Sequence, residues 1–344
     1  MKNIVTFGEI MLRLSPPGML RFSQARSFDL AFGGGESNVA VSLSYFGLPT
    51  QFISRIPAND LGDACIQFLH QFDVGTKFVL RGGERMGVYF MEFGANMRGS
   101  QVIYDRAYSS FSTIRTGMID WESVFSDAGW FHWTGITPAV SEGAAAVCLE
   151  GIKAAKSKGV TISCDLNFRA KLWKWGKSAN EVMQELVSYS DVIIGNEEDA
   201  EKVFGIIAPE SDITAGKVDS DQYKFVCNHL ADQFPSAKRI AITLRGSISA
   251  NHNTWSGIYW DRGSFFEGNK YNLTHIVDRV GSGDSFMAGL IYGLLNFPED
   301  SQKVIDFAVA ASALKHTIVG DFNLVSLVEV EKLLDGNSSG RVSR

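Results

Sequence analysis

Short runs of β-branched and aromatic residues alternate with helical patterns along most of this chain. The first run, residues 3–10 (NIVTFGEI), is apolar almost throughout, as in a strand that is covered on both faces. Residues 35–47 follow as a helical pattern, with Val39, Leu43 and Phe46 on one face. Further strands are expected at 50–56, 130–135, 160–167, 191–196 and 239–244, and further helices at 60–73 and 141–159. The alternation predicts an α/β fold with a mainly parallel central sheet and helices on both faces.

Two stretches interrupt this alternation with strands that have no helix between them. Residues 13–33 and 86–108 contain such strand-like pieces, and the second stretch resembles a hairpin. We therefore expect a small β-sheet that projects from the main body and serves as a lid. A later interruption, residues 247–271, is expected to form a hairpin or loop near the edge of the main sheet.

The end of the chain differs in composition from the rest. Residues 336–344 (GNSSGRVSR) are polar and are expected to form a flexible tail. Residues 1–335 are then expected to form a single domain, because the chain is long enough for one large core and shows no internal repeat.

Composition argues against several classes of protein. The 344 residues carry a net charge of −6 and no block of Lys and Arg, so no nucleic-acid partner is expected. The most apolar segments, residues 121–133 and 182–195, fall short of the roughly 20 apolar residues that a membrane span needs. The N-terminus (MKNIVTFGEIML) lacks the features of a signal peptide, and a cytoplasmic protein is expected.

The cysteines and histidines are scattered along the sequence. Cys65, Cys148, Cys164 and Cys227 form no C-x-x-C pair, so we expect reduced thiols and no zinc site. The six histidines form no H-E-x-x-H motif, which argues against a histidine-based metal site.

Polar side chains follow several expected strands at the point where each strand ends. The carboxyl ends of parallel strands share one edge of an open α/β sheet, and ligands bind outside that edge. These polar residues are Glu9, Asp165, Asn167, Arg169, Asn196, Thr243 and Arg245. The sequence therefore predicts a binding site at this edge.

A glycine-rich stretch near the C-terminus, residues 277–293 (VDRVGSGDSFMAGLIYG), predicts an anion site. Gly281 and Gly283 allow a tight bend with exposed amides, and an apolar helical pattern follows them. The N-terminus of a helix attracts anions. Asp284 would repel a phosphate there unless it accepts a proton. The alternative is that Asp284 is an ordinary helix N-cap among turn glycines.

Three segments, taken in order, resemble the signatures of the ribokinase-like (PfkB) carbohydrate kinases. Residues 32–47 (FGGGESNVAVSLSYFG) resemble their N-terminal Gly-Gly signature, 196–205 (NEEDAEKVFG) their central Asn-x-x-Glu region, and 278–289 (DRVGSGDSFMAG) their C-terminal signature. The resemblance extends from about residue 3 to about residue 330. It implies a three-layer α/β/α sandwich with a small β-sheet lid, and an ATP-dependent transfer of phosphate to a sugar.

The resemblance also implies roles for the glycine stretch. The amides of Gly281, Ser282, Gly283 and Asp284 would hold the transferring phosphate, and Asp284 would accept the proton of the substrate hydroxyl. The chain has no G-x-x-x-x-G-K-[ST] motif, so it is not a P-loop enzyme. A nucleotide-dependent oxidoreductase is also disfavoured, because no G-x-G-x-x-G follows the first strand.

The chain departs from the family pattern at two positions. Ser282 stands where the family usually has Ala, and its small hydroxyl is expected to fit. Asp199 stands where the family usually has Glu to order Mg²⁺ through water, and Glu198 is the alternative for that role. ATP and Mg²⁺ are the implied cofactors, with K⁺ as a further candidate.

Four short segments distinguish the chain within the family: residues 87–94 (GVYFMEFG), 102–106 (VIYDR), 164–173 (CDLNFRAKLW) and 319–323 (VGDFN). With these segments the chain most resembles the 2-keto-3-deoxygluconate kinases. That resemblance implies that phosphate goes to the terminal (6-) hydroxyl of a sugar acid. Arg106 and Arg169 would pair with its carboxylate, since a guanidinium matches a planar carboxylate. The other implied substrate residues are Gly34, Asn38, Tyr89, Tyr104 and Asp321.

Each of these assignments has a structural alternative. Tyr89 and Tyr104 alternate with apolar neighbours, as side chains that pack on one face of a sheet do. Arg106 could pair with Asp105, and Arg169 with Asp165 or Glu9.

Arg13 has no assigned role. It stands where ribokinase-type members have a sugar-binding Asp, which argues against a neutral furanose and for an acidic or phosphorylated sugar. The alternatives to a sugar-acid kinase are a fructokinase, a ribokinase, a sugar-phosphate kinase or a non-catalytic sugar-binding member.

The nucleotide is expected on the C-terminal half of the chain. Asn196, Thr243, Arg245 and Gly246 are the candidates by analogy, and Trp255 and Tyr259 are expected to pack within a hairpin rather than stack on adenine. The exposed apolar strands of the expected lid favour a homo-oligomer or closure over substrate.

Overall fold

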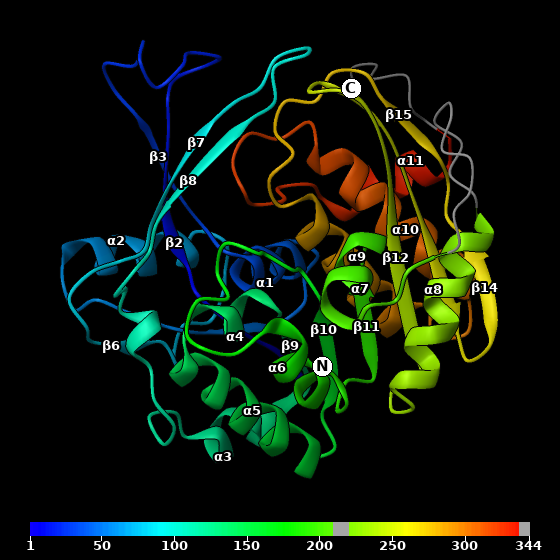
Figure 1. The fold of residues 1–344 in the computed structure, drawn as a ribbon, viewed down its shortest axis with the longest axis horizontal. Helices are drawn as coiled ribbons and strands as arrows, with labels where there is room; N and C mark the ends of the chain where they lie inside the picture. The colour runs from blue at the N-terminus through cyan, green and yellow to red at the C-terminus, as the bar shows by residue number, and fades with distance from the viewer. Residues whose placement is uncertain (209–219, 337–344) are drawn as a thin grey trace.

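The central sheet of this protein is described in a computed structural model that covers residues 1–208 and 220–336. Its strands are β1 (Asn3–Phe7), β4 (Thr50–Ile53), β9 (Ala128–Thr134), β10 (Thr161–Asp165), β11 (Val192–Gly195), β12 (Arg239–Ser249), β13 (His252–Asp261), β14 (Ser264–Glu267) and β15 (Tyr271–Leu273). Within the described residues these nine strands form one sheet in the order β14-β13-β12-β11-β10-β9-β1-β4, and β15 pairs with β13 (Figure 1).

Most of this sheet is parallel, as the alternating sequence pattern predicts. β4, β1, β9, β10, β11 and β12 pair in parallel, whereas β13, β14 and β15 add to the edge in antiparallel pairs. The expected hairpin at 247–271 therefore widens the main sheet. β12 and β13 pair along nearly their whole length, from Arg239 opposite Asp261 to Ser249 opposite His252.

Helices cover both faces of the sheet, so the expected three layers are confirmed. One core cluster joins the sheet to α3 (Trp121–Val124), α5 (Glu142–Ser157), α6 (Ala179–Val187), α7 (Glu197–Phe204) and α8 (Ser220–Gln233). A second cluster joins the opposite face to α1 (Gly35–Tyr45), α9 (Ser282–Asn296), α10 (Ser301–Lys315) and α11 (Leu327–Leu334). Strand β11 shows the division, since Ile193 belongs to the first cluster and Val192 and Ile194 to the second.

A separate small sheet arises from the two stretches that interrupt the alternation. It contains β2 (Met11–Ser15), β3 (Asp29–Gly33), β7 (Val88–Glu92) and β8 (Gln101–Asp105) in the order β3-β2-β7-β8 (Figure 1). The central pair β2–β7 is parallel and the outer pairs are antiparallel. The existence of this sheet is confirmed, and its action as a lid stays a prediction.

Shorter elements complete the N-terminal half. They are α2 (Asp60–His70), α4 (Ile136–Val140), the strand pair β5 (Arg55–Ile56) and β6 (Leu80–Arg81), and two 3₁₀ turns at Phe111–Thr113 and Phe125–Asp127. Helix α2 belongs to the same core cluster as the small sheet, since Cys65 and Leu69 share that cluster with Leu12.

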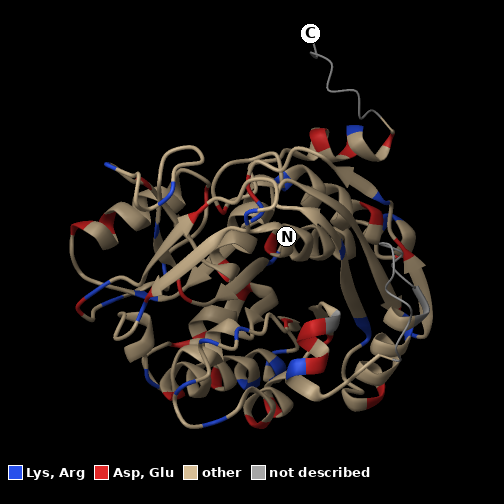
Figure 2. Cartoon of the chain, turned by 45° about the horizontal axis from the view of Figure 1, so that its top comes forward, with Lys and Arg blue, Asp and Glu red and all other residues tan. Residues whose placement is uncertain are grey.

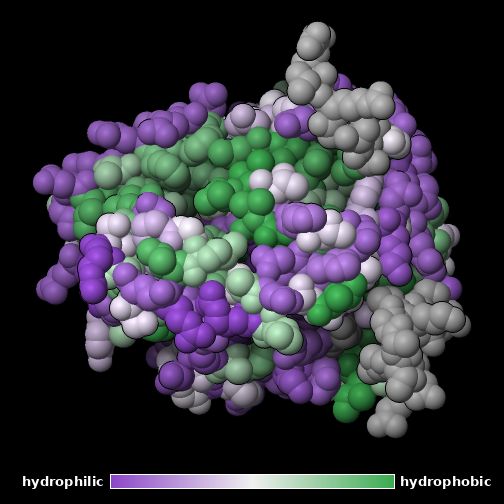
Figure 3. Space-filling view, turned by 90° about the horizontal axis from the view of Figure 1, so that it is seen from above, coloured by the Kyte–Doolittle hydropathy of each residue, from purple (hydrophilic) through white to green (hydrophobic). Residues whose placement is uncertain are grey.

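The surface combines apolar and charged regions. Apolar side chains gather over the small sheet (Figure 3), where Leu30, Ile103 and Tyr104 are exposed. Acidic and basic residues are interspersed along the other elements (Figure 2).

Of the helices that the structure describes, none has the length and apolar character to cross a bilayer. All four cysteines are free thiols and buried. The tail expected at 336–344 lies outside the described residues from position 337 onward.

Candidate active site

A cavity of about 370 Å³ lies where β10, β11 and β12 end, between the main sheet and the small sheet. Its position matches the carboxyl edge at which α/β sheets bind ligands. Many residues predicted from the sequence line it: Gly34, Asn38, Tyr89, Tyr104, Arg169, Asn196, Asp199, Thr243, Arg245, Gly281, Ser282, Gly283, Asp284 and Asp321. Arg106 and Gly246 are not among its lining residues.

The glycine stretch forms the first turn of α9 at the wall of this cavity. Gly281 is the N-cap residue, in the left-handed region with φ 81°. A Cβ there would lie 2.0 Å from the carbonyl oxygen of Asp321, so conformation and space both require glycine. Asp284 is the third residue of the helix and does not cap it, so the alternative N-cap role is wrong. The turn instead contributes Gly281, Ser282, Gly283 and the carboxylate-bearing Asp284 to the lining of one cavity.

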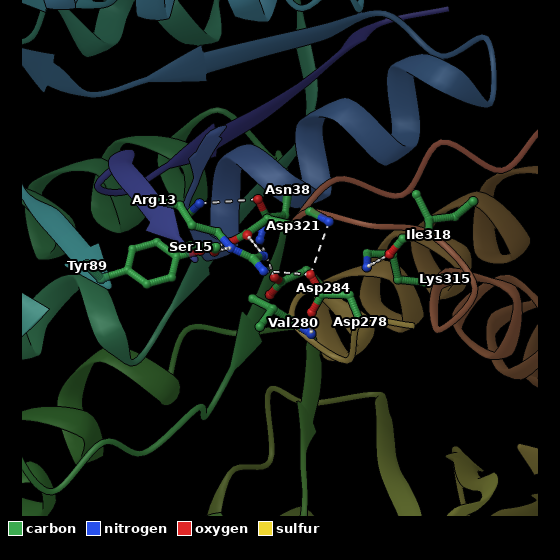
Figure 4. Close-up of polar contacts among 12 residues, drawn as sticks. Arg13, Ser15, Asn38, Tyr89, Asp278, Val280, Asp284, Lys315, Ile318 and Asp321 are labelled. Atoms are coloured by element: carbon green, nitrogen blue, oxygen red, sulfur yellow. Dashed lines mark hydrogen bonds and ion pairs between the residues drawn. The ribbon is translucent and has the colours of Figure 1, made fainter. Parts of the chain in front are cut away.

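Asp284 is buried and held in place by one side chain. Nδ2 of Asn38 donates to its Oδ2 at 2.7 Å (Figure 4). Burial raises the pKa of Asp284 to about 6, although the Asn38 bond and the charges of Arg169 and Lys315 oppose this rise. A carboxylate with this pKa is ionised in most molecules at neutral pH and is basic enough to take up a proton.

Helix α1 supplies Asn38 because its first turn is anchored to the end of β9. The buried carboxylate of Glu36 accepts hydrogen bonds from the Thr134 amide at 3.0 Å and the Thr137 hydroxyl at 2.6 Å. Burial raises the pKa of Glu36 to about 7. Gly34 must approach closely, since a Cβ on it would lie 2.0 Å from the carbonyl oxygen of Glu9. Its amide donates to Oδ1 of Asn38 at 3.2 Å.

Arg13, which has no role assigned from the sequence, belongs to a buried cluster of charged side chains. Its Nη1 donates to Asp321 at 2.6 Å, its Nη2 to Asp278 at 2.7 Å, and its Nε to the Ser15 hydroxyl at 3.0 Å (Figure 4). All three charged groups are buried. Burial alone would lower the pKa of Arg13, but the two carboxylates raise it above its ordinary value. This guanidinium binds protein carboxylates, so it does not supply the expected preference for an acidic sugar.

The two tyrosines of the small sheet differ in their surroundings. The Tyr89 hydroxyl is buried and donates to Asp321, whereas Tyr104 is exposed at the cavity. Their rings lie 6.1 Å apart between centroids. Burial and the neighbouring Asp321 carboxylate raise the pKa of Tyr89 well above its ordinary range. Tyr104 therefore remains the tyrosine whose hydroxyl is open to a ligand.

Arg106 has a protein partner away from the cavity. Its guanidinium pairs with the buried carboxylate of Glu9, with 2.8 Å from Nε to Oε2, and the Ser109 hydroxyl donates to the same carboxylate. Asp105 pairs instead with Arg85, at 2.9 Å. The alternative pairs Arg106–Asp105 and Arg169–Glu9 are therefore wrong, and contact of Arg106 with substrate stays a prediction.

The part of the cavity where the sequence predicts the nucleotide is built around the start of α7. Asn196 caps this helix by accepting from the Asp199 amide at 2.8 Å, and Asp199 Oδ2 accepts from the Asn196 amide at 3.1 Å. Asp199 Oδ1 accepts from the Phe168 amide at 2.9 Å. Burial raises the pKa of Asp199. The carboxylate thus joins the loop after β10 to α7, while Glu198 is exposed and outside the cavity lining.

Thr243, Arg245 and Trp255 line the cavity from the widened edge of the sheet. The Arg245 guanidinium carbon lies 5.4 Å from the centre of the Trp255 ring. Trp255 and Tyr259 are both buried within the sheet, as expected from the hairpin interpretation.

Several lining residues have no role assigned from the sequence. Asp165 and Asn167 were recognised at the end of β10, and burial, together with Asp199 and Asp284, raises the pKa of Asp165 well above its ordinary range. Arg279 lies two residues before Gly281 and donates to the Ala250 carbonyl at 2.5 Å. Its place inside the glycine stretch is the signal that could have identified it.

Comparison with known proteins decides the family. The model of the pfkB family carbohydrate kinases matches residues 1–227 and 257–323. The chain is a member of the PfkB family of carbohydrate kinases. This PfkB kinase is 31% identical over 338 residues to a 2-dehydro-3-deoxygalactonokinase of Haloferax volcanii, with 98% of each chain covered. It is 26% identical over 341 residues to a 2-dehydro-3-deoxygluconokinase of Thermoproteus tenax, with 97% of this chain and 94% of the relative covered.

Solved structures agree with the fold of this PfkB kinase. A 2-dehydro-3-deoxygluconokinase from Thermotoga maritima is 46% identical, with a TM-score of 0.92 over 98% of this chain and 100% of that one. The ribokinase-like architecture expected from the sequence is therefore confirmed. Membership of a kinase family implies that ATP and a sugar are substrates.

Proposed function

We propose that this kinase transfers the γ-phosphoryl group of ATP to the terminal (6-) hydroxyl of a 2-keto-3-deoxy sugar acid, with 2-keto-3-deoxygluconate as the leading candidate. One observation carries the proposal: the Asp284 carboxylate and the amide turn that precedes it share a cavity with Asn38 and Arg169. The names of the relatives in Haloferax, Thermoproteus and Thermotoga support the choice of substrate.

Asp284 is the proposed general base. The Asn38 amide leaves one lone pair of Oδ2 and the whole of Oδ1 for the substrate hydroxyl. With its pKa raised to about 6, the carboxylate takes the hydroxyl proton as the oxygen attacks phosphorus.

The turn at 281–284 is the proposed cradle for the transferring phosphate. The first amides of a helix have no partner within the helix, and the helix dipole is positive at this end. A Cβ on Gly283 would meet nothing within 4 Å, so the backbone is open on that side. The carboxylate of Asp284 then faces the alcohol while the amides face the phosphate.

Magnesium fits the acidic residues of the cavity. Mg²⁺ usually binds through one or two carboxylates, water and substrate phosphates, and Asp165 and Asp199 both line the cavity. When bound, the ion neutralises charge on the phosphates. We assign Asp199 to hold it through water, as the sequence predicts, and add Asp165 as a second carboxylate.

Arg169 is the residue that we assign to the substrate carboxylate. Arg13 and Arg106 already pair with buried carboxylates. Arg169 is exposed at the cavity and donates only to its neighbouring carbonyl, that of Phe168, among the bonds of the described residues. A guanidinium in this position can form a bidentate pair with a sugar acid.

The test is an ADP-release assay with 2-keto-3-deoxygluconate, its galactonate epimer, fructose, ribose and a hexose phosphate. We expect the two keto-deoxy acids to be the best substrates. A higher kcat/KM for a neutral sugar or a sugar phosphate would contradict the proposed substrate class, and it would not bear on the proposed role of Asp284.

The base is tested separately with Asp284→Asn, and Asp232→Asn on the exposed surface of α8 serves as the control. Asp284→Asn should lower kcat at least about 100-fold, the usual cost of losing a general base, with ATP affinity unchanged. Turnover within about tenfold of wild type would exclude Asp284 as the base, and it would reopen the question of a different catalytic group.

A further inference from the structure

Lys315, the last residue of α10, is a buried cation to which the mechanism above assigns no role. Its side chain is fully excluded from solvent, which is rare for lysine unless the ammonium is paired. Its Nζ donates to the carbonyl oxygen of Ile318 at 3.1 Å (Figure 4). Its Cε lies 3.4 Å from the point where a Cβ on Gly281 would stand. The lysine therefore packs directly against the turn that begins α9.

The charges around this ammonium come from four elements. Asp278, Asp321 and Asp284 attract it and Arg13 repels it. Arg13 is already bonded to Asp278 and Asp321. Asp278 in turn accepts from the amides of Val280 and Gly320, each at 3.0 Å, so it fixes the turn before α9 and the loop after α10.

The balance of these charges depends on Lys315. Among the buried groups around the turn, three carboxylates face the guanidinium of Arg13 and the ammonium of Lys315. Arg169 and Arg279 line the cavity from more exposed positions. Without the ammonium, Arg13 would be the single buried cation beside three carboxylates and a bound phosphate. Such a cluster would disfavour a further anion, because charges in a buried site are weakly screened.

We propose that Lys315 is a positioning residue that acts as a tethered monovalent cation beneath the phosphate turn. Its ammonium supplies the positive charge that a bound K⁺ or NH₄⁺ would otherwise supply, and its bond to Ile318 holds the loop of residues 316–321 against Gly281. The inference rests on the proposed phosphate cradle. It implies that K⁺, a candidate cofactor from the sequence, is dispensable for the wild-type enzyme.

The first test needs no variant. Initial rates of the wild-type enzyme are measured with K⁺ replaced by tetramethylammonium at constant ionic strength. Because the cation is covalently attached, rates should agree within about twofold. A fall of about tenfold or more on removing K⁺ would overturn the proposal.

The second test replaces the ammonium with a neutral chain of similar length, Lys315→Met, and uses Lys303→Met, an exposed position on the same helix, as the matched control. Lys315→Met should lower kcat about 10- to 100-fold, less than the loss of a direct donor, because Lys315 acts through the turn. Added NH₄⁺ or K⁺ at about 100 mM should raise the kcat of Lys315→Met at least about fivefold, while tetramethylammonium should leave it unchanged. The control should match wild type in every medium.

Two results for Lys315→Met would contradict the proposal. A folded Lys315→Met enzyme with wild-type kcat, or with a low kcat that no small cation raises, would assign Lys315 to packing alone. Folding is checked by the urea midpoint, and the wild-type cation test stands even if the variant does not fold. The ATP affinity of wild type and Lys315→Met is also measured without sugar, so this second measurement does not depend on the proposed sugar being correct. Asp284→Asn should stay inactive with every cation, which separates loss of the base from loss of the tethered charge.

Discussion

Arg13→Met offers a direct measure of what the buried charge cluster contributes. Methionine keeps most of the apolar stem and removes the guanidinium that bonds to Asp278 at 2.7 Å and to Asp321 at 2.6 Å. Both carboxylates stay buried, so the loss is the cost of an uncompensated charge. Breaking one buried pair typically costs about 3–5 kcal/mol, and we expect Arg13→Met to lose at least about 3 kcal/mol of the free energy of unfolding.

The control is Arg85→Met, which also removes an arginine–aspartate pair close to the small sheet. The side chains of Arg85 and Asp105 are 38% and 57% exposed, and those of Arg13 and Asp278 are 3% and 0% exposed. An exposed pair of this kind contributes about 0–1 kcal/mol after screening by solvent. The comparison therefore isolates burial, since the residue types are the same.

The assay is urea-induced unfolding of both variants and wild type at equal protein concentration, with a shared m-value. Sugar KM should also rise in Arg13→Met, because Asp321 and its partner Tyr89 lose an anchor. Equal midpoints for the two variants, or a loss below about 1 kcal/mol for Arg13→Met, would show that the cluster tolerates an unpaired carboxylate and would refute the reasoning.

Two further outcomes concern the reaction itself. Arg169→Ala should raise KM for keto-deoxy acids at least about tenfold while KM for ATP changes less than about twofold, because the lost group is the proposed partner of the sugar carboxylate. Equal changes for both substrates, measured by initial rates, would exclude that role. The pH profile should show an acid limb: the pKa of Asp284 is raised to about 6, so below that pH the base becomes protonated and kcat/KM for the sugar should fall about tenfold per pH unit. A profile flat from pH 5 to 7 (approximate range) would contradict an ionised Asp284 as the essential form.

Local patterns in the sequence predicted much of this architecture. The apolar runs at 191–196 and 239–244 became β11 and β12, because a strand covered on both faces must be apolar along its length. The glycine stretch predicted the first turn of α9, since few residues other than glycine adopt the φ of Gly281. The widening of the sheet by β13 and β14 was not predicted, because pairing partners depend on the whole fold.

Partners that are distant in sequence account for what the patterns missed. Arg13 bonds to Asp321 and Asp278, which lie 308 and 265 residues further along the chain. The alternative partner predicted for Arg106 was its neighbour Asp105, but Arg106 pairs with Glu9, 97 residues earlier. Single-sequence patterns report propensities over a few turns and carry no information on such contacts.

The bond between Asn38 and Asp284 joins residues that are 246 positions apart, on α1 and α9. During synthesis on the ribosome, the small sheet and α1 emerge first, while the proposed base and the proposed phosphate turn emerge near the end. A nascent chain, or a product of premature termination before residue 281, therefore holds neither of the proposed groups, so the proposed reaction requires α9 as well as α1.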